Sequence, residues 1–175
     1  SAVGSAATYT IQSSDNPGDT LTCTATATDT DGGTDTDSVS VTVDNTDPVL
    51  SAVAITPSTG TVGDTLTCSA TASDNDGGVP TLTYTWTNGT SAVGSAATYT
   101  IQDSDDPGDT LTCTVTATDT DGGTHTDSAT ATVNNTAPVI ATVAISPTSG
   151  AVGDTLTCTA TATDADGDTP TVTYA

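Results

Sequence analysis

A five-residue motif, Asp-Thr-Leu-Thr-Cys, recurs along this chain at a constant interval of 45 residues. Its four copies begin at Asp19, Asp64, Asp109 and Asp154. Neighbouring 45-residue blocks differ, whereas blocks two apart are nearly identical, so the true unit is 90 residues long. This period is longer than the roughly 20 to 50 residues of solenoid repeats. It indicates a row of whole domains, each with its own core.

The phase of the repeat divides the chain into three parts. The segment SAVGSAATYTIQ opens the chain and returns at Ser91, and the final TVTYA matches the TLTYT of residues 81–85. We therefore expect residues 1–46 to be the C-terminal half of one domain, residues 47–136 a complete domain, and residues 137–175 the N-terminal half of the next. We interpret the chain as a segment of a longer polymer, or as a subunit whose two ends complete each other's domains.

The charge of the chain has one sign only. There is no Lys or Arg, and the 22 acidic residues, all Asp, give a formal charge of −22. At an effective dielectric constant near 20, two carboxylates about 5 Å apart repel by about 3 kcal/mol, so clustered Asp residues need solvent or bound cations. The basic surface that nucleic acids and anionic membranes require is missing, so we expect neither as a partner.

Most of the chain alternates between Thr and apolar residues, which is the pattern of half-buried strands. Expected strands cover residues 65–72, 81–87, 98–102, 110–118 and 128–133, with a shorter strand around Val53 and Ile55. Turn-forming Gly, Pro, Asn and Asp residues separate these runs, and no helical pattern competes. Six or seven short strands in about 90 residues predict an all-β fold, an antiparallel β-sandwich.

The four cysteines also lie 45 residues apart, and no Cys-x-x-Cys pair is present. Such spacing favours structural disulfides over metal ligation, which implies an oxidising, extracellular location. No apolar run reaches the roughly 18 residues of a membrane-spanning helix, and we expect any secretion signal to lie upstream.

The order of Cys68, Trp86 and Cys113 on successive expected strands resembles the immunoglobulin-like fold. The resemblance is to the bacterial Ig-like, PKD-like and cadherin-like tandem repeats of large secreted surface or fibre proteins. The linkers DNTDPV and NNTAPV of this chain are similar to the joints between domains in those families. It implies a disulfide between Cys68 and Cys113 packed against Trp86. By the same rule, Cys23 and Cys158 would pair outside this chain or with each other across a subunit joint. Leu111 departs from the pattern by standing where those domains place a corner tyrosine.

Each 45-residue block carries one Asp-rich turn of the form Asp-x-Asp-Gly. In an Ig-like sandwich, two of these turns lie at one pole beside the incoming linker, and the preceding domain adds its own acidic loop. Ca²⁺ binds six to eight oxygen ligands, so the resemblance implies a Ca²⁺ site at the domain joint. The candidate ligands are Asp44, Asp47, Asp74, Asp76, Asp119 and Asp121, with Asp15 and Asp19 from the preceding domain. The alternative is that each turn is a simple hairpin connection with no ion.

Three further polar residues have interpretations that require no specific function. His125 replaces Asp35 of the other copy, so we expect an exposed turn residue. Asn88 and Asn134 match the N-glycosylation triplet, but a chain so rich in Thr produces this triplet by chance.

The sequence contains no catalytic nucleophile paired with a general base, no phosphate-binding loop and no transition-metal motif, so we do not expect an enzyme. It favours a structural segment of an extracellular fibre or stalk, stiffened by disulfides and Ca²⁺, with copies of itself as partners. One alternative is the stalk of a surface adhesin, whose ligand the sequence does not identify. Another is an ice-binding protein, because TCTATAT presents Thr at every second position.

Overall fold

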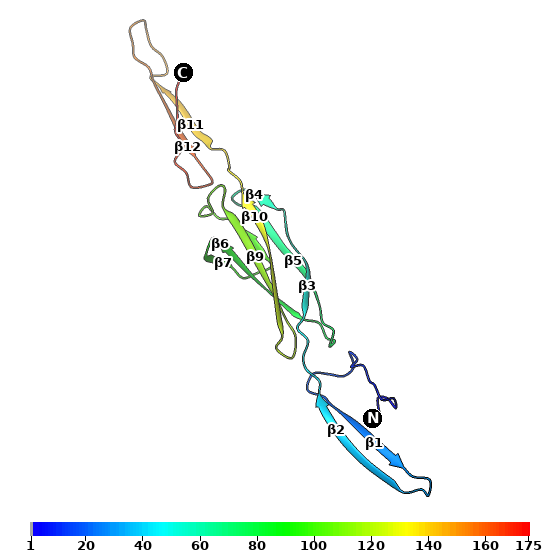
Figure 1. Ribbon diagram of the computed structural model, residues 1–175. Helices are drawn as coiled ribbons and strands as arrows, with labels where there is room; N and C mark the ends of the chain where they lie inside the picture. The colour runs from blue at the N-terminus through cyan, green and yellow to red at the C-terminus, as the bar shows by residue number, and fades with distance from the viewer. Residues whose placement is uncertain (1) are drawn as a thin grey trace. The chain divides into compact units, whose positions relative to one another are not determined.

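A computed structural model describes residues 2–175, and this part of the chain consists of β-strands and loops (Figure 1). It contains no helix of the length and hydrophobicity needed to cross a membrane. The strands are β1 (Thr20–Thr28), β2 (Thr34–Thr42), β3 (Val49–Thr56), β4 (Thr59–Gly60), β5 (Thr65–Ser73), β6 (Thr81–Asn88), β7 (Ser91–Gly94), β8 (Thr98–Thr100), β9 (Thr110–Thr118), β10 (Thr124–Val133), β11 (Val139–Ser146) and β12 (Thr157–Thr163). The expectation of an all-β chain is confirmed.

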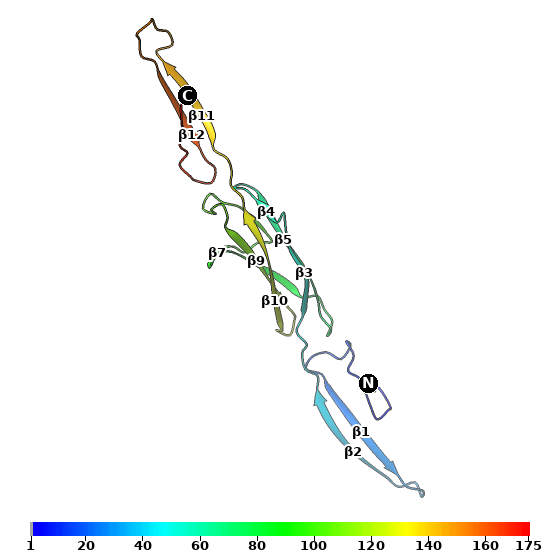
Figure 2. The same ribbon diagram turned by 45° about the horizontal axis from the view of Figure 1, so that its top comes forward.

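Two sheets form between residues 49 and 133. The larger has five strands in the order β4-β10-β9-β6-β7, and the smaller has three in the order β3-β5-β8. Figures 1 and 2 show β3 and β5 in one layer, with β9 and β10 in the other. β5 pairs antiparallel with β8 and β6 with β7, whereas the two-residue strand β4 runs parallel to β10. This arrangement is consistent with a β-sandwich.

The alternating pattern locates the longer strands closely. Strand β9 has the expected bounds, β5 and β6 each extend one residue further, and β10 begins four residues earlier than expected. On β9, Leu111, Cys113, Val115 and Ala117 are fully buried, whereas the threonines between them are partly exposed. Successive side chains of a strand point to opposite faces, so this burial follows directly from the sequence.

Two short strands were not predicted. Strand β7 has the sequence Ser-Ala-Val-Gly, in which two adjacent apolar side chains give no alternation, and β4 has only two residues. Both form because a longer strand presents unpaired backbone groups beside them.

The chain divides into two compact units. One unit contains the residues up to Ala52, Ala70–Thr83 and Val115–Asp127; the other contains Val53–Ser69, Tyr84–Thr114 and Ser128–Ala175. The buried side chains of the first unit include Val43, Pro48, Leu50, Val115 and Ala117. Those of the second include Leu66, Trp86, Ile101, Leu111 and Val133.

The two flanking segments each form one two-stranded sheet, β1-β2 and β11-β12. Every residue of β2 is exposed, and so is every residue of β11, although both strands carry apolar side chains. The large exposed apolar side chains of the two sheets are Val39, Val41, Val139, Ile140, Val143 and Ile145.

Candidate functional site: the disulfide core and the domain joints

The expected disulfide between Cys68 and Cys113 is present. Cys68 lies on β5 of the smaller sheet and Cys113 on β9 of the larger one, with Cα atoms 6.5 Å apart, so the bond ties the two sheets together. Trp86 is fully buried in the same unit and stacks on Tyr99, with ring centroids 5.7 Å apart. Its Nε1 donates a hydrogen bond of 2.9 Å to the carbonyl of Ala96.

A buried carboxylate lies beside this core, in the loop between β8 and β9. Asp105 is 1% exposed, and its Oδ2 accepts hydrogen bonds from the Tyr99 hydroxyl at 2.7 Å and the Gln102 backbone N–H at 2.9 Å. Its Oδ1 accepts a third bond from Asn88 Nδ2 at 2.9 Å. A buried charge is tolerated when it has this many donors.

Burial, followed by the bond to Asp105, raises the pKa of Tyr99 well above its usual value. The same pair recurs 90 residues earlier, where the Tyr9 hydroxyl donates to Asp15 Oδ2 at 2.7 Å. That hydrogen bond is the main reason that the pKa of Tyr9 is raised. The signal available in the sequence was the repeated spacing of six residues between Tyr and Asp.

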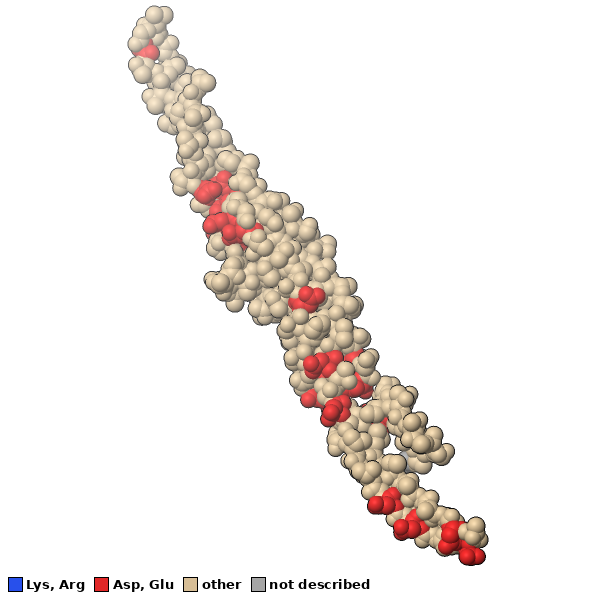
Figure 3. All heavy atoms as spheres, in the orientation of Figure 1, with Lys and Arg blue, Asp and Glu red and all other residues tan. Residues whose placement is uncertain are grey.

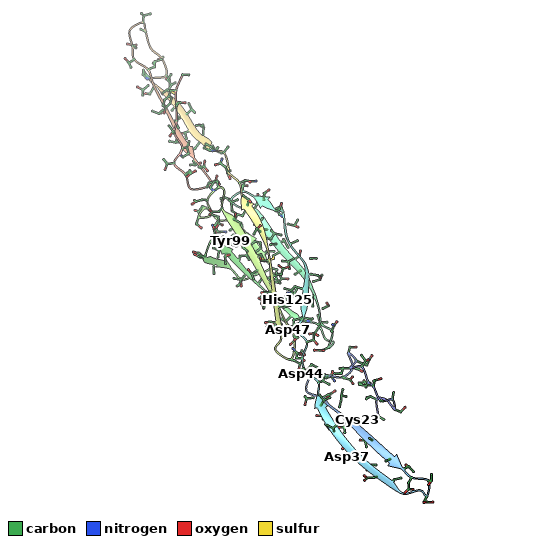
Figure 4. The ribbon with its side chains drawn as sticks, viewed as in Figure 1. Cys23, Asp37, Asp44, Asp47, Tyr99 and His125 are labelled. Atoms are coloured by element: carbon green, nitrogen blue, oxygen red, sulfur yellow. A yellow bond between two sulfur atoms is a disulfide. The ribbon has the colours of Figure 1, made fainter. Side chains whose placement is uncertain are left out.

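We call residues 44–48, together with the turns at 74–78 and 119–123, the first joint. Two hydrogen bonds hold its linker to the following turns, and a third holds the start of β3 to β10. The Thr46 backbone N–H donates to Asp76 Oδ2, Asn45 Nδ2 donates to Asp119 Oδ2 at 3.0 Å, and the Leu50 N–H donates to His125 Nδ1 at 2.9 Å. Figure 4 shows Asp47 and His125 at this end of the sheets. His125 is exposed as expected, but it lies in β10 rather than in a turn, and its ring anchors the start of β3.

Gly123 leaves room for three polar side chains in the first joint. A Cβ atom at this position would lie 2.4 Å from Asp119 Oδ2, 2.6 Å from Asn45 Nδ2 and 2.6 Å from Asp47 Oδ1. The hydrogen bond from Asn45 is the main cause that lowers the pKa of Asp119, and the backbone N–H groups of Gly123 and Asp121 lower it further. Asn45 was not among the predicted site residues.

The structure therefore brings only some of the proposed calcium ligands together. Asp47 and Asp119 meet over Gly123, whereas Asp76 accepts from the linker and Asp74 accepts the N–H of Asp76 within its own turn. Asp121 Oδ2 accepts from the neighbouring Thr120 hydroxyl. The remaining candidates are Asp44, which is exposed, and Asp15 and Asp19, which cap backbone N–H groups of their own loop.

Across residues 2–175, no group of three or more His, Cys, Asp or Glu side chains is placed so that it could hold a metal ion. Figure 3 shows the carboxylates as separate patches with no Lys or Arg beside them.

A second joint, formed by residues 134–138 and the turn at 164–168, repeats one hydrogen bond of the first, 90 residues later. The Thr136 N–H donates to Asp166 Oδ2 at 2.6 Å, as Thr46 does to Asp76. A Cβ atom added to Gly167 would lie 3.4 Å from the backbone carbonyl oxygen of Asp103. A Cβ atom added to Gly77, the equivalent residue of the first joint, would lie 3.8 Å from the carbonyl oxygen of Ser13.

The second joint also differs from the first. Asn134 and Ala137 replace the acidic Asp44 and Asp47. Asp166 is 3% exposed, and its Oδ1 and the Thr136 hydroxyl are both buried without a hydrogen-bond partner.

The two glycosylation candidates have different surroundings. Asn88 Nδ2, the atom that would carry a glycan, donates to Asp105 at 2.9 Å and to Asp109 at 2.6 Å. Asn134 is exposed, and its backbone N–H donates to the carbonyl of Gly60 at 2.7 Å. Of the two, Asn134 has the more accessible side chain.

Cys23 and Cys158 are free and exposed.

Comparison with known proteins adds no assignment, because neither a protein-family model nor a curated protein matches the chain.

Proposed function

We propose that this chain is a structural segment of an extracellular fibre or stalk made of tandem Ig-like domains, with residues 47–136 as one complete domain. The observation that carries the proposal is the recurrence of one joint, in which the linker N–H of Thr46 or Thr136 bonds to the turn carboxylate of Asp76 or Asp166. A linker that only connected two independent domains would be solvated and mobile. A linker bonded to the next domain in the same way at each repeat sets a repeated orientation.

The sheet order supports the Ig-like assignment. Strands β10, β9 and β6 lie side by side in one sheet, and β5 lies beside β8 in the other, as the G, F, C and the B, E strands do in that fold. The disulfide joins the B and F equivalents, and Trp86 lies on the C equivalent. Because structural disulfides persist in oxidising surroundings, the bond also supports an extracellular location.

The hydrogen bonds of the first joint explain how such a stalk resists bending. Each bond contributes about 0.5 to 1.5 kcal/mol, and bonds to a charged carboxylate contribute more. Two of them, at Asn45 and Thr46, hold the linker to the following turns, and a third holds Leu50 at the start of β3 to His125. Bending the linker away from these turns would break both of its bonds, so its stiffness exceeds that of a free linker.

We also propose that Ca²⁺ strengthens the first joint. The carboxylates of Asp47 and Asp119 face the same space over Gly123, and carboxylate oxygens are the ligands that Ca²⁺ prefers. Rotating the Asn45 side-chain amide by half a turn would replace its N–H₂ with a carbonyl oxygen, a third ligand of the same kind. Asp44, Asp74, Asp76 and Asp121 are the nearby acids that could complete the shell, and the second joint has fewer of them.

Calcium titration and solution scattering test this proposal together. We expect a dissociation constant of roughly 0.1 to 1 mM for Ca²⁺, the range of extracellular sites, and a narrower distribution of joint angles with Ca²⁺ than with chelator. A variant with Asp47→Asn and Asp119→Asn should bind Ca²⁺ at least about tenfold more weakly, because two charged ligands are lost. A variant with Asp37→Asn and Asp106→Asn makes the same change in charge and should behave as the wild type.

Two outcomes would count against the proposal in different ways. Equal binding by the two double variants would exclude this calcium site. A scattering curve typical of freely jointed domains, with and without Ca²⁺, would exclude a stiff stalk.

A further inference from the structure

We propose that His125 is a pH-sensitive contact of the first joint: protonation of its imidazole releases the start of β3 and loosens the linker that leads into it. This inference rests on the proposed function, because it adds regulation to the joint that sets the stiffness of the stalk. It is carried by a hydrogen bond that only a neutral imidazole can accept and by a strained residue in the strand that this bond holds.

The bond from the Leu50 backbone N–H to His125 Nδ1 fixes the protonation state of the ring. It is 2.9 Å long and connects β3 of the smaller sheet to β10 of the larger one. A backbone N–H can only donate, so Nδ1 is an unprotonated acceptor and the neutral ring carries its proton on Nε2. An imidazolium has a proton on both nitrogens and no acceptor left. The contact therefore exists only while His125 is uncharged.

Protons reach this ring directly from solvent. The His125 side chain is exposed, whereas the side chain of Leu50 is buried in the core. An imidazole ordinarily takes up a proton at about pH 6.5, which lies in the range of many extracellular fluids and their acidified compartments. Mild acid therefore removes the acceptor without requiring any part of the fold to open first.

The other ionisable groups around His125 are all carboxylates. Strand β3 and the neighbouring strand β9 carry no acidic or basic side chain. Carboxylates ordinarily titrate near pH 4, so they keep their charge while an imidazole takes up its proton. The charge of this region therefore changes at His125 between about pH 8 and pH 5. The surrounding carboxylates are Asp127 on β10 itself, Asp44 and Asp47 in the linker, and Asp74, Asp76, Asp119 and Asp121 in the two turns.

The start of β3 also contains a strained backbone residue. Ala52 has a φ of 55°, in the left-handed region that residues with a Cβ atom rarely adopt. A residue persists in this conformation only when its surroundings hold it there. On its N-terminal side, the Ser51 and Thr71 hydroxyls lie 2.7 Å apart, and Leu50 bonds to His125. When the His125 bond is lost, relaxation of Ala52 favours release of the strand start.

Release of Leu50 affects the linker because the two are continuous. Asn45 and Thr46 bond to the turns, Pro48 is buried, and the Leu50 bond closes the same short segment. Each of these contacts limits the movement of the residues between them. Without the Leu50 bond, the segment is held by fewer contacts, so the range of linker orientations widens.

The internal repeat shows what the histidine adds. Asp35 occupies the position of His125 in the preceding copy. A carboxylate is also a hydrogen-bond acceptor, but it ordinarily keeps its charge and its acceptor atoms above about pH 5. The exchange of Asp for His therefore preserves an acceptor at this position and makes it sensitive to mild acid.

NMR spectroscopy of the full chain tests the contact directly. His125 is the only histidine of the chain, so its ring signals follow a single titration. We expect the proton of the neutral ring on Nε2, and a Leu50 amide signal that moves between pH 8 and pH 5 with the same midpoint as the ring. A neutral ring with its proton on Nδ1 would overturn the proposal, and so would a Leu50 amide that does not follow the ring.

Two variants separate the loss of the acceptor from other effects of pH. At pH 8, the Leu50 N–H of His125→Ala should exchange with solvent about 2- to 10-fold faster than that of the wild type, which corresponds to one ordinary hydrogen bond. At pH 5, the two rates should agree. His125→Asn is the matched control, because its side-chain oxygen can replace Nδ1 and does not titrate. Its Leu50 amide signal should not move with the ring titration of the wild type. A ratio of wild-type to His125→Ala rates that is the same at both pH values would contradict the proposal.

Solution scattering connects the contact to the joint. In the presence of chelator, the wild type should show a broader distribution of joint angles at pH 5 than at pH 8. His125→Asn should show the same distribution at both pH values, which controls for every carboxylate of the chain. An equal change in the two proteins would assign the effect to the carboxylates and overturn the role of His125.

The outcomes separate this inference from the function on which it rests. If the joint is stiff at both pH values and the Leu50 amide does not follow the ring, the inference is wrong and the stalk remains. If the Leu50 amide follows the ring but the joint is freely flexible even at pH 8, the stiff stalk is wrong and the pH-sensitive contact of β3 holds.

Discussion

At the scale of single residues, the chain depends on carboxylates that serve as hydrogen-bond acceptors rather than as partners of cations. Asp105 is buried with three donors, and Asp119 accepts from Asn45 and from backbone N–H groups of its own turn. Because the chain has no Lys or Arg, neutral donors are the stabilising partners available to these charges within the protein. Removing one donor should therefore be costly wherever the carboxylate is buried.

Tyr99→Phe removes one donor from the buried Asp105 without creating a large cavity. We expect a loss of about 1 to 3 kcal/mol in the free energy of unfolding, because the carboxylate loses a partner that water does not replace. Thermal unfolding followed by circular dichroism measures this effect. Tyr84→Phe, on a partly exposed residue of β6, is the matched control and should change little. Equal effects of the two variants would contradict the network.

At the scale of elements, the first joint is a contact between the linker of residues 44–48 and the turns at 74–78 and 119–123. Gly123 makes the approach possible, because a Cβ atom there would overlap Asp119, Asn45 and Asp47. The sequence predicted the acidic turns, since Asp-x-Asp-Gly recurs with the repeat, and the resemblance to Ig-like domains implied that they converge with the linker. It did not predict Asn45 or His125 as linker contacts, because single polar residues carry no periodic signal.

The first joint should loosen in acid. The pKa of Asp119 is lower in the folded chain than its usual value near 3.9, so its bond stabilises the joint fully above that value. The contribution is lost as the pH falls through the lowered pKa. We expect the Asn45 side-chain amide signal in NMR spectra to shift in this range below about pH 4.

Asp119→Asn should abolish that shift, because no proton is then taken up. Asp64, whose pKa is lowered mainly by the Thr61 backbone N–H, offers the control. Asp64→Asn should leave the Asn45 shift as in the wild type, and a shift that persists in Asp119→Asn would contradict the assignment.

At the scale of the whole molecule, the stability of the two sheets between residues 49 and 133 rests on a small core and one disulfide. The core contains Trp86 and Tyr99 but no Phe or Met, and small domains of this kind usually need covalent support. Cys68 and Cys113 are 45 residues apart, and closing a loop of this length stabilises by about 4 kcal/mol in the chain-entropy description.

Replacing both Cys68 and Cys113 with Ala should therefore lower the melting temperature by roughly 15 to 30 °C, from about 4 to 8 °C per kcal/mol for a domain of this size. Differential scanning calorimetry of the full chain checks this. Replacing Cys23 and Cys158 with Ala in the monomer is the control. Because these residues are free and exposed, the main transition should not move. Similar losses in both double variants would mean that the disulfide is not the main support.

The sequence alone determined the all-β class and the long strands, which follow from local alternation, whereas the pair Cys68–Cys113 was implied by the resemblance to Ig-like domains. Tertiary structure decided what local pattern leaves open. The segment SAVGSAATYTIQ is the clearest case, because its copy at residues 91–102 contains two strands and its copy at residues 2–12 contains none. A strand exists only where another strand satisfies its backbone groups, and a partner distant in the sequence supplies them.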